Sequence, residues 1–252
     1  MKRSVIAVIL LVLVFALGGC AAITAHAGSA CIYDNAERYS AGDAEFTERV
    51  ESLDIEWISG NVRVVTAKQD SVTVSETVSG QISDDLRVHT FLDGSALRVR
   101  FRKSGLNAGT DSKDLTVTIP EGTALSSLKI ESALGDITID SVTADTCEIE
   151  TAMGTAETIG ADFRELKIES ASGDTKCGLA RAPENAAISS AAGSVTVSLP
   201  KDAGLTLKTD LAVGSIHSDF SMAKVNERYV IGDGSGKMKI EVAVGDINLK
   251  AN

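Results

Sequence analysis

The sequence predicts an all-β chain, a single-domain β-solenoid resembling a parallel β-helix, with about 20 residues per coil and an antiparallel N-terminal portion. Three observations support this prediction. The triplet Ala-x-Gly occurs six times in the C-terminal half, and the gaps between successive glycines are 19, 19, 20, 21 and 31 residues. Apolar and β-branched residues alternate with polar ones on both sides of each glycine. Only 4% of the residues are aromatic, which suits a narrow interior filled by aliphatic and hydroxyl side chains.

Each copy of the repeat indicates a strand, a corner and a second strand. Positions seven, five and three before the glycine, and two and four after it, are expected to point inward. The corner requires glycine because a larger side chain would collide there or because the backbone needs a positive φ. In the second copy, Ala156 and Thr158 stand where other copies have larger apolar residues, which would allow the register to slip. The six glycines are Gly135, Gly154, Gly173, Gly193, Gly214 and Gly245.

Two outward positions of the repeat are charged. The position six before the glycine is mostly lysine, at Lys129, Lys167, Lys208 and Lys239. The position four before it is mostly acidic, at Glu131, Glu150, Glu169, Asp210 and Glu241. Stacking coils about 4.8 Å apart would bury the inward residues and leave these columns on the surface. Diagonal neighbours of opposite sign would then offset the like-charge repulsion within each column.

Residues 1–20 are typical of a lipoprotein-type signal peptide. Two basic residues precede an apolar run, and the run ends in Leu-Gly-Gly-Cys, which resembles the bacterial lipobox. Cys20 is therefore the expected lipidation site. Three alternatives remain open: ordinary signal-peptidase cleavage at Ala25–Ala27, retention of Val5–Ala22 as an uncleaved anchor, and an incidental thiol at Cys20. Lipidation, ordinary secretion and an uncleaved anchor all place the domain outside the cytoplasm.

Residues 21–64 connect the predicted signal peptide to the regular repeats. Residues 21–45 are small and polar and are expected to form a flexible tether, followed by the solenoid domain at 46–252. Ile55–Val64 is a degenerate first copy of the repeat with Gly60 at its corner. Trp57, the only tryptophan, would point inward in this copy, and a role in covering the open end is favoured over a ligand platform.

The stretch before the regular repeats predicts antiparallel strands. The expected strands are Val72–Thr77, Leu86–Phe91, Leu97–Phe101 and Leu115–Pro120. The turn at Asp93-Gly94 would pair the second and third of them as a hairpin. A short helical period occurs at Ala44–Leu53, and residues 103–113 form a polar loop. Near the C-terminus, Phe220–Lys237 fills the longest gap and is expected to loop out before the last coil.

Five segments in a fixed order carry a family resemblance. They are Ile55–Val64, Leu115–Gly122, the Lys-Ile-Glu-Ser-Ala-x-Gly-Asp runs at 129–136 and 167–174, and Gly232–Gly236 before Lys239–Ile247. Together they resemble the bacterial putative-adhesin family of unknown function, which also occurs in Lia-type cell-envelope stress proteins. The resemblance covers about residues 50–250 and implies a β-helical, envelope-associated domain. The family has no established catalytic residues, so the resemblance assigns none here.

The charge of the chain excludes some partners. The 252 residues carry a formal net charge of −11, and loss of Lys2 and Arg3 with the leader would make it −13. A chain this acidic is not expected to bind nucleic acid, or an anionic membrane surface, through its general field. We therefore do not expect the charge of the chain to attach it to the membrane.

The cysteines do not indicate a metal or cofactor site. They are Cys20, Cys31, Cys147 and Cys177, and no Cys-x-x-Cys or Cys/His cluster is present. Cys147 and Cys177 occupy inward positions, so both are expected to be small buried side chains. A Cys147–Cys177 disulfide between adjacent coils is the alternative.

Three Gly-Asp pairs place acids at the corners. Asp136, Asp174 and Asp246 follow their glycines, and the other copies have Thr155, Ser194 and Ser215 there. A calcium stripe is one interpretation of this pattern. Capping of the turns is favoured, because Asp136 and Asp174 would be two coils, about 9–10 Å, apart.

An enzyme is the alternative from another function class. Stacked acids at Glu131, Glu150 and Glu169 would supply the paired carboxylates of a carbohydrate-active β-helix lyase or hydrolase. The acids recur periodically and each has a lysine beside it, which is typical of a solvated face. The histidines are His26, His89 and His217, and their positions imply no catalytic pairing. No catalytic residue is therefore expected.

The sequence thus predicts a non-enzymatic surface domain of the bacterial cell envelope, outside the cytoplasm and anchored by lipid at Cys20. Its expected role is binding, scaffolding or stress sensing. The expected partner is an envelope protein or a cell-wall polymer, reached through the regular outer face or the open strand edges. We expect no nucleic acid partner, no metal and no cofactor.

Overall fold

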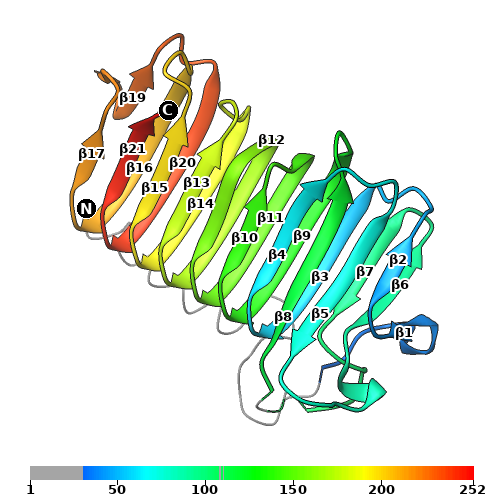
Figure 1. Ribbon diagram of the computed structural model, residues 1–252. Coiled ribbons are helices and arrows are strands. Elements are labelled where there is room, and N and C mark those ends of the chain that lie inside the picture. Colours follow the sequence, from blue (N-terminus) through cyan, green and yellow to red (C-terminus); the bar gives the residue numbers. More distant parts are fainter. Residues whose placement is uncertain (1–30, 108, 110) are drawn as a thin grey trace.

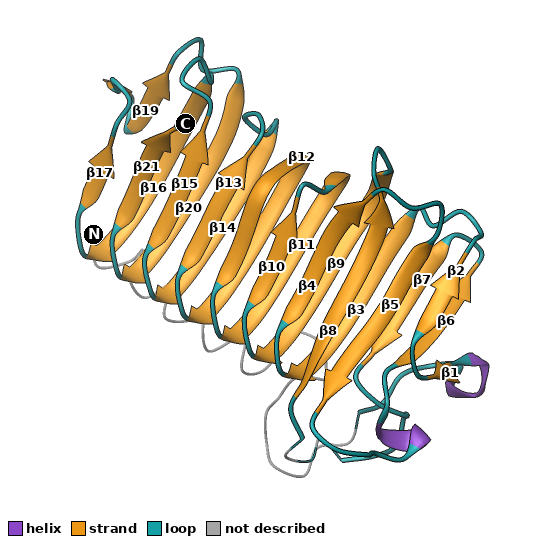
Figure 2. Ribbon diagram, in the orientation of Figure 1, coloured by secondary structure: helices purple, strands orange, loops and turns teal. Residues whose placement is uncertain are grey.

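The computed structural model describes residues 31–107, 109 and 111–252. These residues form 21 strands and two 3₁₀-helices, η1 (Ala36–Arg38) and η2 (Asp84–Leu86). The strands belong to one curled sheet of mixed orientation, so the chain is all-β as predicted (Figure 1, Figure 2). No helix in this part of the chain is long and apolar enough to cross a membrane. The predicted leader and Cys20 lie outside the described residues.

The sheet curls into two walls of parallel strands that face each other across the core. In spatial order the first wall holds β7 (Ala96–Arg100), β3 (Ser52–Ser59), β9 (Ala124–Leu134), β11 (Thr143–Met153), the second half of β12 (Ala156–Ser172), β14 (Asn185–Ala192), β20 (Gly236–Val244) and β16 (Leu205–Val213). The second wall holds β8 (Lys113–Pro120), β4 (Val62–Ala67), β10 (Ile137–Asp140), the first half of β12, β13 (Thr175–Leu179), β15 (Val195–Leu199), β21 (Ile247–Ala251) and β17 (Ile216–Ser218). Strand β12 runs through both walls, which makes the sheet β-helix-like.

The inward positions predicted from the repeat form the core. Ile149 on β11 pairs in register with Ile130 on β9 and Ile168 on β12, and all three are fully buried. The expected slip in the second copy does not occur at Ala156 and Thr158, which stay in register and buried. The register between β12 and β13 shifts only between Thr158 and Ala161, where the chain bends from one wall into the other.

The last two coils do not stack in chain order. Strands β20 and β21, red in Figure 1, lie between β14 and β15 on one side and β16 and β17 on the other. The segment expected to loop out instead forms β18 (Ala223–Val225) and β19 (Arg228–Ile231). Strand β19 pairs antiparallel with the outer edge of β16 and returns the chain to the start of β20. The hairpin covers the edge of the first wall that β16 would otherwise leave open.

Antiparallel strands also end the stack at the N-terminal side, as predicted. They are β1 (Ser40–Ala41), β2 (Ala44–Phe46), β5 (Val72–Val78) and β6 (His89–Asp93). Strands β6 and β7 form the expected hairpin across Asp93 and Ala96. Two expectations need correction. The described part of the 21–45 tether contains β1 and most of β2, and Ala44–Leu53 is not helical, because these residues pair with the ends of both walls.

Trp57 lies one coil inside the stack rather than at its end. Its side chain is fully buried, and its indole Nε1 donates a hydrogen bond of 2.8 Å to the Lys113 carbonyl. The indole ring packs edge to face against the Phe101 ring, with 4.8 Å between the ring centroids. A ligand platform at Trp57 is therefore excluded, and the antiparallel strands beyond it close this end.

A buried ion pair supports the same end of the core. The Lys113 ammonium lies 2.8 Å from Glu76, and their side chains are 0% and 2% exposed. The ammonium also donates to the Leu86 and Phe101 carbonyls at 2.7 and 2.5 Å. Burial lowers the pKa of Lys113, while Glu76 opposes that shift. Pairing and full hydrogen bonding are what make a buried lysine tolerable.

The corner glycines form a ladder through the stack. A Cβ on Gly154 would lie 2.1 Å from the Gly135 carbonyl oxygen, and a Cβ on Gly173 would lie 2.1 Å from that of Gly154. Both glycines also have φ above +120°. Both reasons given for glycine at the corner, close approach and positive φ, therefore apply.

Candidate binding groove on the first wall

The outer face of the first wall presents three rows of side chains that run across the strands. The first, called the polar row, consists of Ser127, Thr146, Glu165, Asn185, Lys237 and Thr206. The second, called the alternating row, consists of Lys129, Glu148, Lys167, Ala187, Lys239 and Lys208. The third, called the acidic row, consists of Glu131, Glu150, Glu169, Ser189, Glu241 and Asp210. Members of a row are register partners on neighbouring strands, so each row follows the stack.

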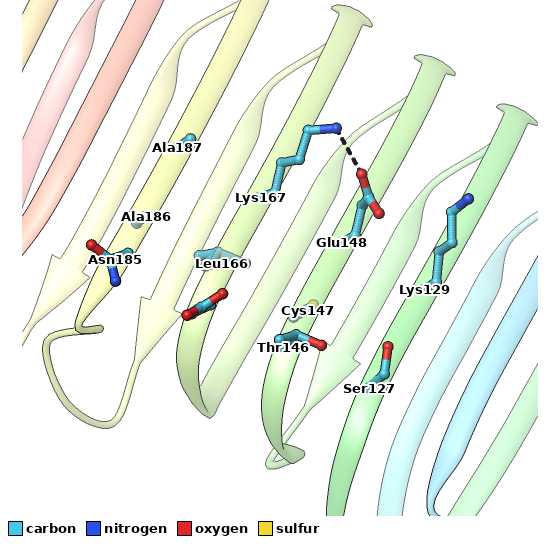
Figure 3. A pocket seen from close by; sticks show the side chains of 11 residues that line it. Ser127, Lys129, Thr146, Cys147, Glu148, Leu166, Lys167, Asn185, Ala186 and Ala187 are labelled. Atoms are coloured by element: carbon cyan, nitrogen blue, oxygen red, sulfur yellow. Dashed lines mark hydrogen bonds and ion pairs between the residues drawn. The ribbon is translucent and has the colours of Figure 1, made fainter. Parts of the chain in front are cut away.

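Charges of opposite sign alternate along one part of the alternating row. Lys129 is in register with Glu148, and Glu148 with Lys167. Lys167 donates to Glu148 at 2.7 Å (Figure 3). It also lies 3.3 Å from Glu169 in the acidic row. Glu148 therefore separates Lys129 and Lys167 in this part of the row, where the opposite charge of the register partner offsets the repulsion between the lysines.

The alternation stops at Ala187, and the wall is hollowed around it. A cavity of about 330 Å³ lies over β9, β11, β12 and β14, lined by residues of the polar and alternating rows from Ser127 to Ala187 (Figure 3). A second cavity of about 240 Å³ lies over β14, β20, β16 and β19. Both cavities are lined by Asn185 and Ala186, so they adjoin at β14, and the two adjoining cavities together are called the groove. Small side chains on β14 make its floor, because lysine or glutamate at 187 would fill the space.

The far end of the groove is cationic. Its second cavity is lined by Lys208 on β16, Arg228 on β19, and Lys237 and Lys239 on β20. All four side chains are exposed. Lys239 pairs with Glu241 at 2.8 Å. Sequence reasoning missed this cluster because Arg228 and Lys237 fall in the segment expected to loop out. The local signal was the basic Lys-Met-Lys run at 237–239.

The acidic row contains the carboxylates considered for catalysis. Glu131, Glu150 and Glu169 are adjacent as predicted, but Glu131 is buried and paired with Lys129 at 2.5 Å. Lys167 lies 3.8 Å from Glu150. Burial, and then the charge of Glu131, raises the pKa of Glu150. The three acids do not line the groove, whose own acids are Glu148 and Glu165.

The corner aspartates cap the next coil along the stack. Asp136, Asp174 and Asp246 accept backbone N–H bonds from Thr155, Ser194 and Ser215 at 2.7, 2.9 and 2.8 Å. The favoured turn-capping role is therefore confirmed. In stacking order Asp alternates with Thr or Ser, and each aspartate accepts from the amide of the following coil.

Of the remaining sequence candidates that the structure describes, only Cys147 borders the groove, as a buried side chain beneath the first cavity. Cys147 and Cys177 are buried free thiols, so the alternative disulfide is wrong. Burial raises the pKa of both, that of Cys177 to about 12. His89 is buried on β6 with Nδ1 2.9 Å from the Arg87 carbonyl, and His217 is on β17 in the other wall.

Comparisons with known proteins establish the family. The profile of the Toastrack DUF4097 family matches residues 47–250. A putative cell adhesion protein from Clostridium sporogenes is 14% identical, with 84% of this chain and 100% of that chain covered and a TM-score of 0.54. A putative adhesin from Bacteroides fragilis is 13% identical, with coverages of 82% and 95% and a TM-score of 0.42. No curated protein matches the chain. Since the profile spans most of the sequence, the chain belongs to the Toastrack DUF4097 family.

Proposed function

We propose that this chain is a non-enzymatic binding and scaffold module of the bacterial cell envelope, held at the membrane by a lipid on Cys20. Residues 1–20 would be the signal peptide. The two walls together would form a β-solenoid of about 20 residues per coil. Within this class we favour an envelope scaffold or stress-sensing role over host adhesion. The family match, and the description of the Clostridium protein as a putative cell adhesion protein, support a binding role for this chain.

The groove is the observation that carries the proposal. It follows six neighbouring strands from β9 to β16, a span of roughly 24 Å at strand spacing. Its floor is backbone-paired sheet, so the surface is already ordered before a partner arrives. Preordered surfaces bind with a smaller entropic cost. An extended and shallow groove of this kind, with charged and hydroxyl side chains beside apolar floor atoms, fits a chain-like partner better than a small molecule.

The groove can be tested by filling it. Ala187→Trp places a large side chain on its exposed floor, and Thr196→Trp is the matched control on the outer face of the second wall. We expect the full chain to be retained by purified cell-wall polymer, and Ala187→Trp to lose retention while Thr196→Trp keeps it. Equal retention of both variants would remove the groove from the proposal.

The enzyme alternative rests on one observation, the adjacent carboxylates of the acidic row. Glu131 and Glu150 are register partners, and their mutual repulsion contributes to the raised pKa of Glu150. Joint replacement of Glu131, Glu150 and Glu169 by glutamine should leave polymer retention unchanged. Sugar release by the parent chain that the triple variant lacks would establish the enzyme instead.

The lipid anchor has a separate test. Cys20→Ala should move the protein from the membrane fraction to the soluble fraction, because an acyl-linked cysteine would be the attachment point. Retention of Cys20→Ala in the membrane fraction would favour an uncleaved anchor over lipidation.

A further inference from the structure

Like charges meet where the alternating row ends. Lys239 on β20 is the direct register partner of Lys208 on β16. On the other side of β16, Leu207 pairs with Tyr229, so Lys208 and Arg228 are the next residues along that pair of strands. Like charges directly opposite each other destabilise a sheet. Along the rest of this row Glu148 or Ala187 separates the lysines, so Lys239 and Lys208 are its one pair of directly opposed like charges.

Nearby acids compensate only part of this charge. Glu241 forms an ion pair with Lys239 at 2.8 Å. Asp210 on β16 is the register partner of Glu241. Among the described residues, no ion pair involves the other three cations, Lys208, Lys237 and Arg228. Three unpaired cations around one cavity form a local anion site on a chain whose net charge is −11.

We propose that this cationic end of the groove binds a phosphate group carried by a hydroxyl-rich polymer. The inference rests on the proposed function and names the class of its partner. A phosphate presents several acceptor oxygens, which lysines and an arginine on three different strands can meet together. The adjoining cavity offers Ser127, Thr146 and Asn185, which can exchange hydrogen bonds with the hydroxyls of the same chain.

A polymer is favoured over a phospholipid surface as the source of the phosphate. The cations lie in a groove on a wall that also carries the partly exposed Glu148 and Glu165. A flat anionic membrane would meet those carboxylates and the net negative charge of the chain at the same time. A flexible chain can place its phosphate on the cations and pass beside the acids.

The test uses the full chain in detergent and three probes: phosphorylated dextran, unmodified dextran of the same length, and phosphatidylglycerol vesicles. We expect binding to phosphorylated dextran, with an affinity that falls as salt rises. The double variant K208Q/R228Q should lose about tenfold or more in affinity, because two charge-assisted contacts disappear. K176Q/K250Q removes the same charge from exposed positions on the second wall and should bind like the parent.

Each other result overturns the inference. Equal affinity of K208Q/R228Q and the parent would place the phosphate elsewhere, while the polymer-binding function would stand. Equal binding of both dextrans would also keep that function but remove the role of phosphate. Binding to the vesicles alone would replace the polymer by a lipid, and binding to no probe while cell-wall polymer is retained would exclude phosphate recognition.

A folding control separates binding from damage. K208Q should not lower the melting temperature of the free protein, because it removes a like-charge contact with Lys239. Phosphorylated dextran should raise the melting temperature of the parent and not that of K208Q/R228Q. A lowered melting temperature for K208Q alone would show that Lys208 supports the fold, which contradicts the inference.

Discussion

Gly173 lies in the middle of the corner ladder, and its replacement by alanine should force two coils apart. The added Cβ would lie 2.1 Å from the Gly154 carbonyl oxygen. Relief of that contact requires a local separation of roughly 1 Å or more. Two hydrogen bonds flank the corner, from Gly154 N–H to the Ser172 carbonyl and from Ala156 N–H to the Asp174 carbonyl, both 3.0 Å long. The separation would stretch both.

The expected cost can be assembled from these parts. Gly173 has φ of +128°, a backbone conformation that costs a non-glycine residue about 1–3 kcal/mol. Loss of two hydrogen bonds adds about 0.5–1.5 kcal/mol each. The free energy of unfolding should therefore fall by about 2–6 kcal/mol.

Gly122→Ala is the matched control. Gly122 also has a positive φ, +84°, but a Cβ there would meet nothing within 4 Å. Its cost should be limited to the backbone conformation, about 1–2 kcal/mol. Urea unfolding followed by circular dichroism measures both variants, with the slope of the transition checked for a change in cooperativity. Equal midpoints for the two variants would refute close contact between coils at the corner.

Three other predictions follow from the core and the acidic row. Ile149→Asp places a charge among fully buried side chains and should abolish cooperative unfolding in circular dichroism; a parent-like melt would refute its inward placement. Glu76→Gln should cost about 3–5 kcal/mol in urea unfolding by leaving Lys113 buried without its counter-charge, and an unchanged midpoint would contradict that. The raised pKa of Glu150 means that its ionisation destabilises the fold as pH rises from the ordinary carboxyl range through the folded-state pKa. Glu150→Gln should thus be the more stable protein at pH 7, with the difference shrinking at low pH; a constant difference would refute the linkage.

The repeat was predictable because it is a matter of local chemistry. The alternation around each Ala-x-Gly identifies inward residues such as Ile149 and Ile168, and the glycines identify the corners. The aspartate, serine and threonine residues after the glycines indicate capping. Each of these signals needs only a few neighbouring residues and the geometry of a strand or turn.

The stacking order was not predictable, because the copies are nearly equivalent in sequence. Nothing in the segment around Lys208 distinguishes a coil that stacks on β14 from one that stacks on β20. The order depends on the antiparallel pairing of β19 with β16, which sets the return path of the chain. The cationic end of the groove depends on that path, since it brings Lys208, Lys239 and Arg228 together.

The most direct test of the account is co-sedimentation of the full chain, in detergent, with purified cell-wall polymer, with the supernatant assayed for released sugar. The account predicts that the chain pellets with the polymer, that salt weakens this retention, and that no sugar is released. Release of oligosaccharide, or a chain that stays in the supernatant at low salt, would contradict it.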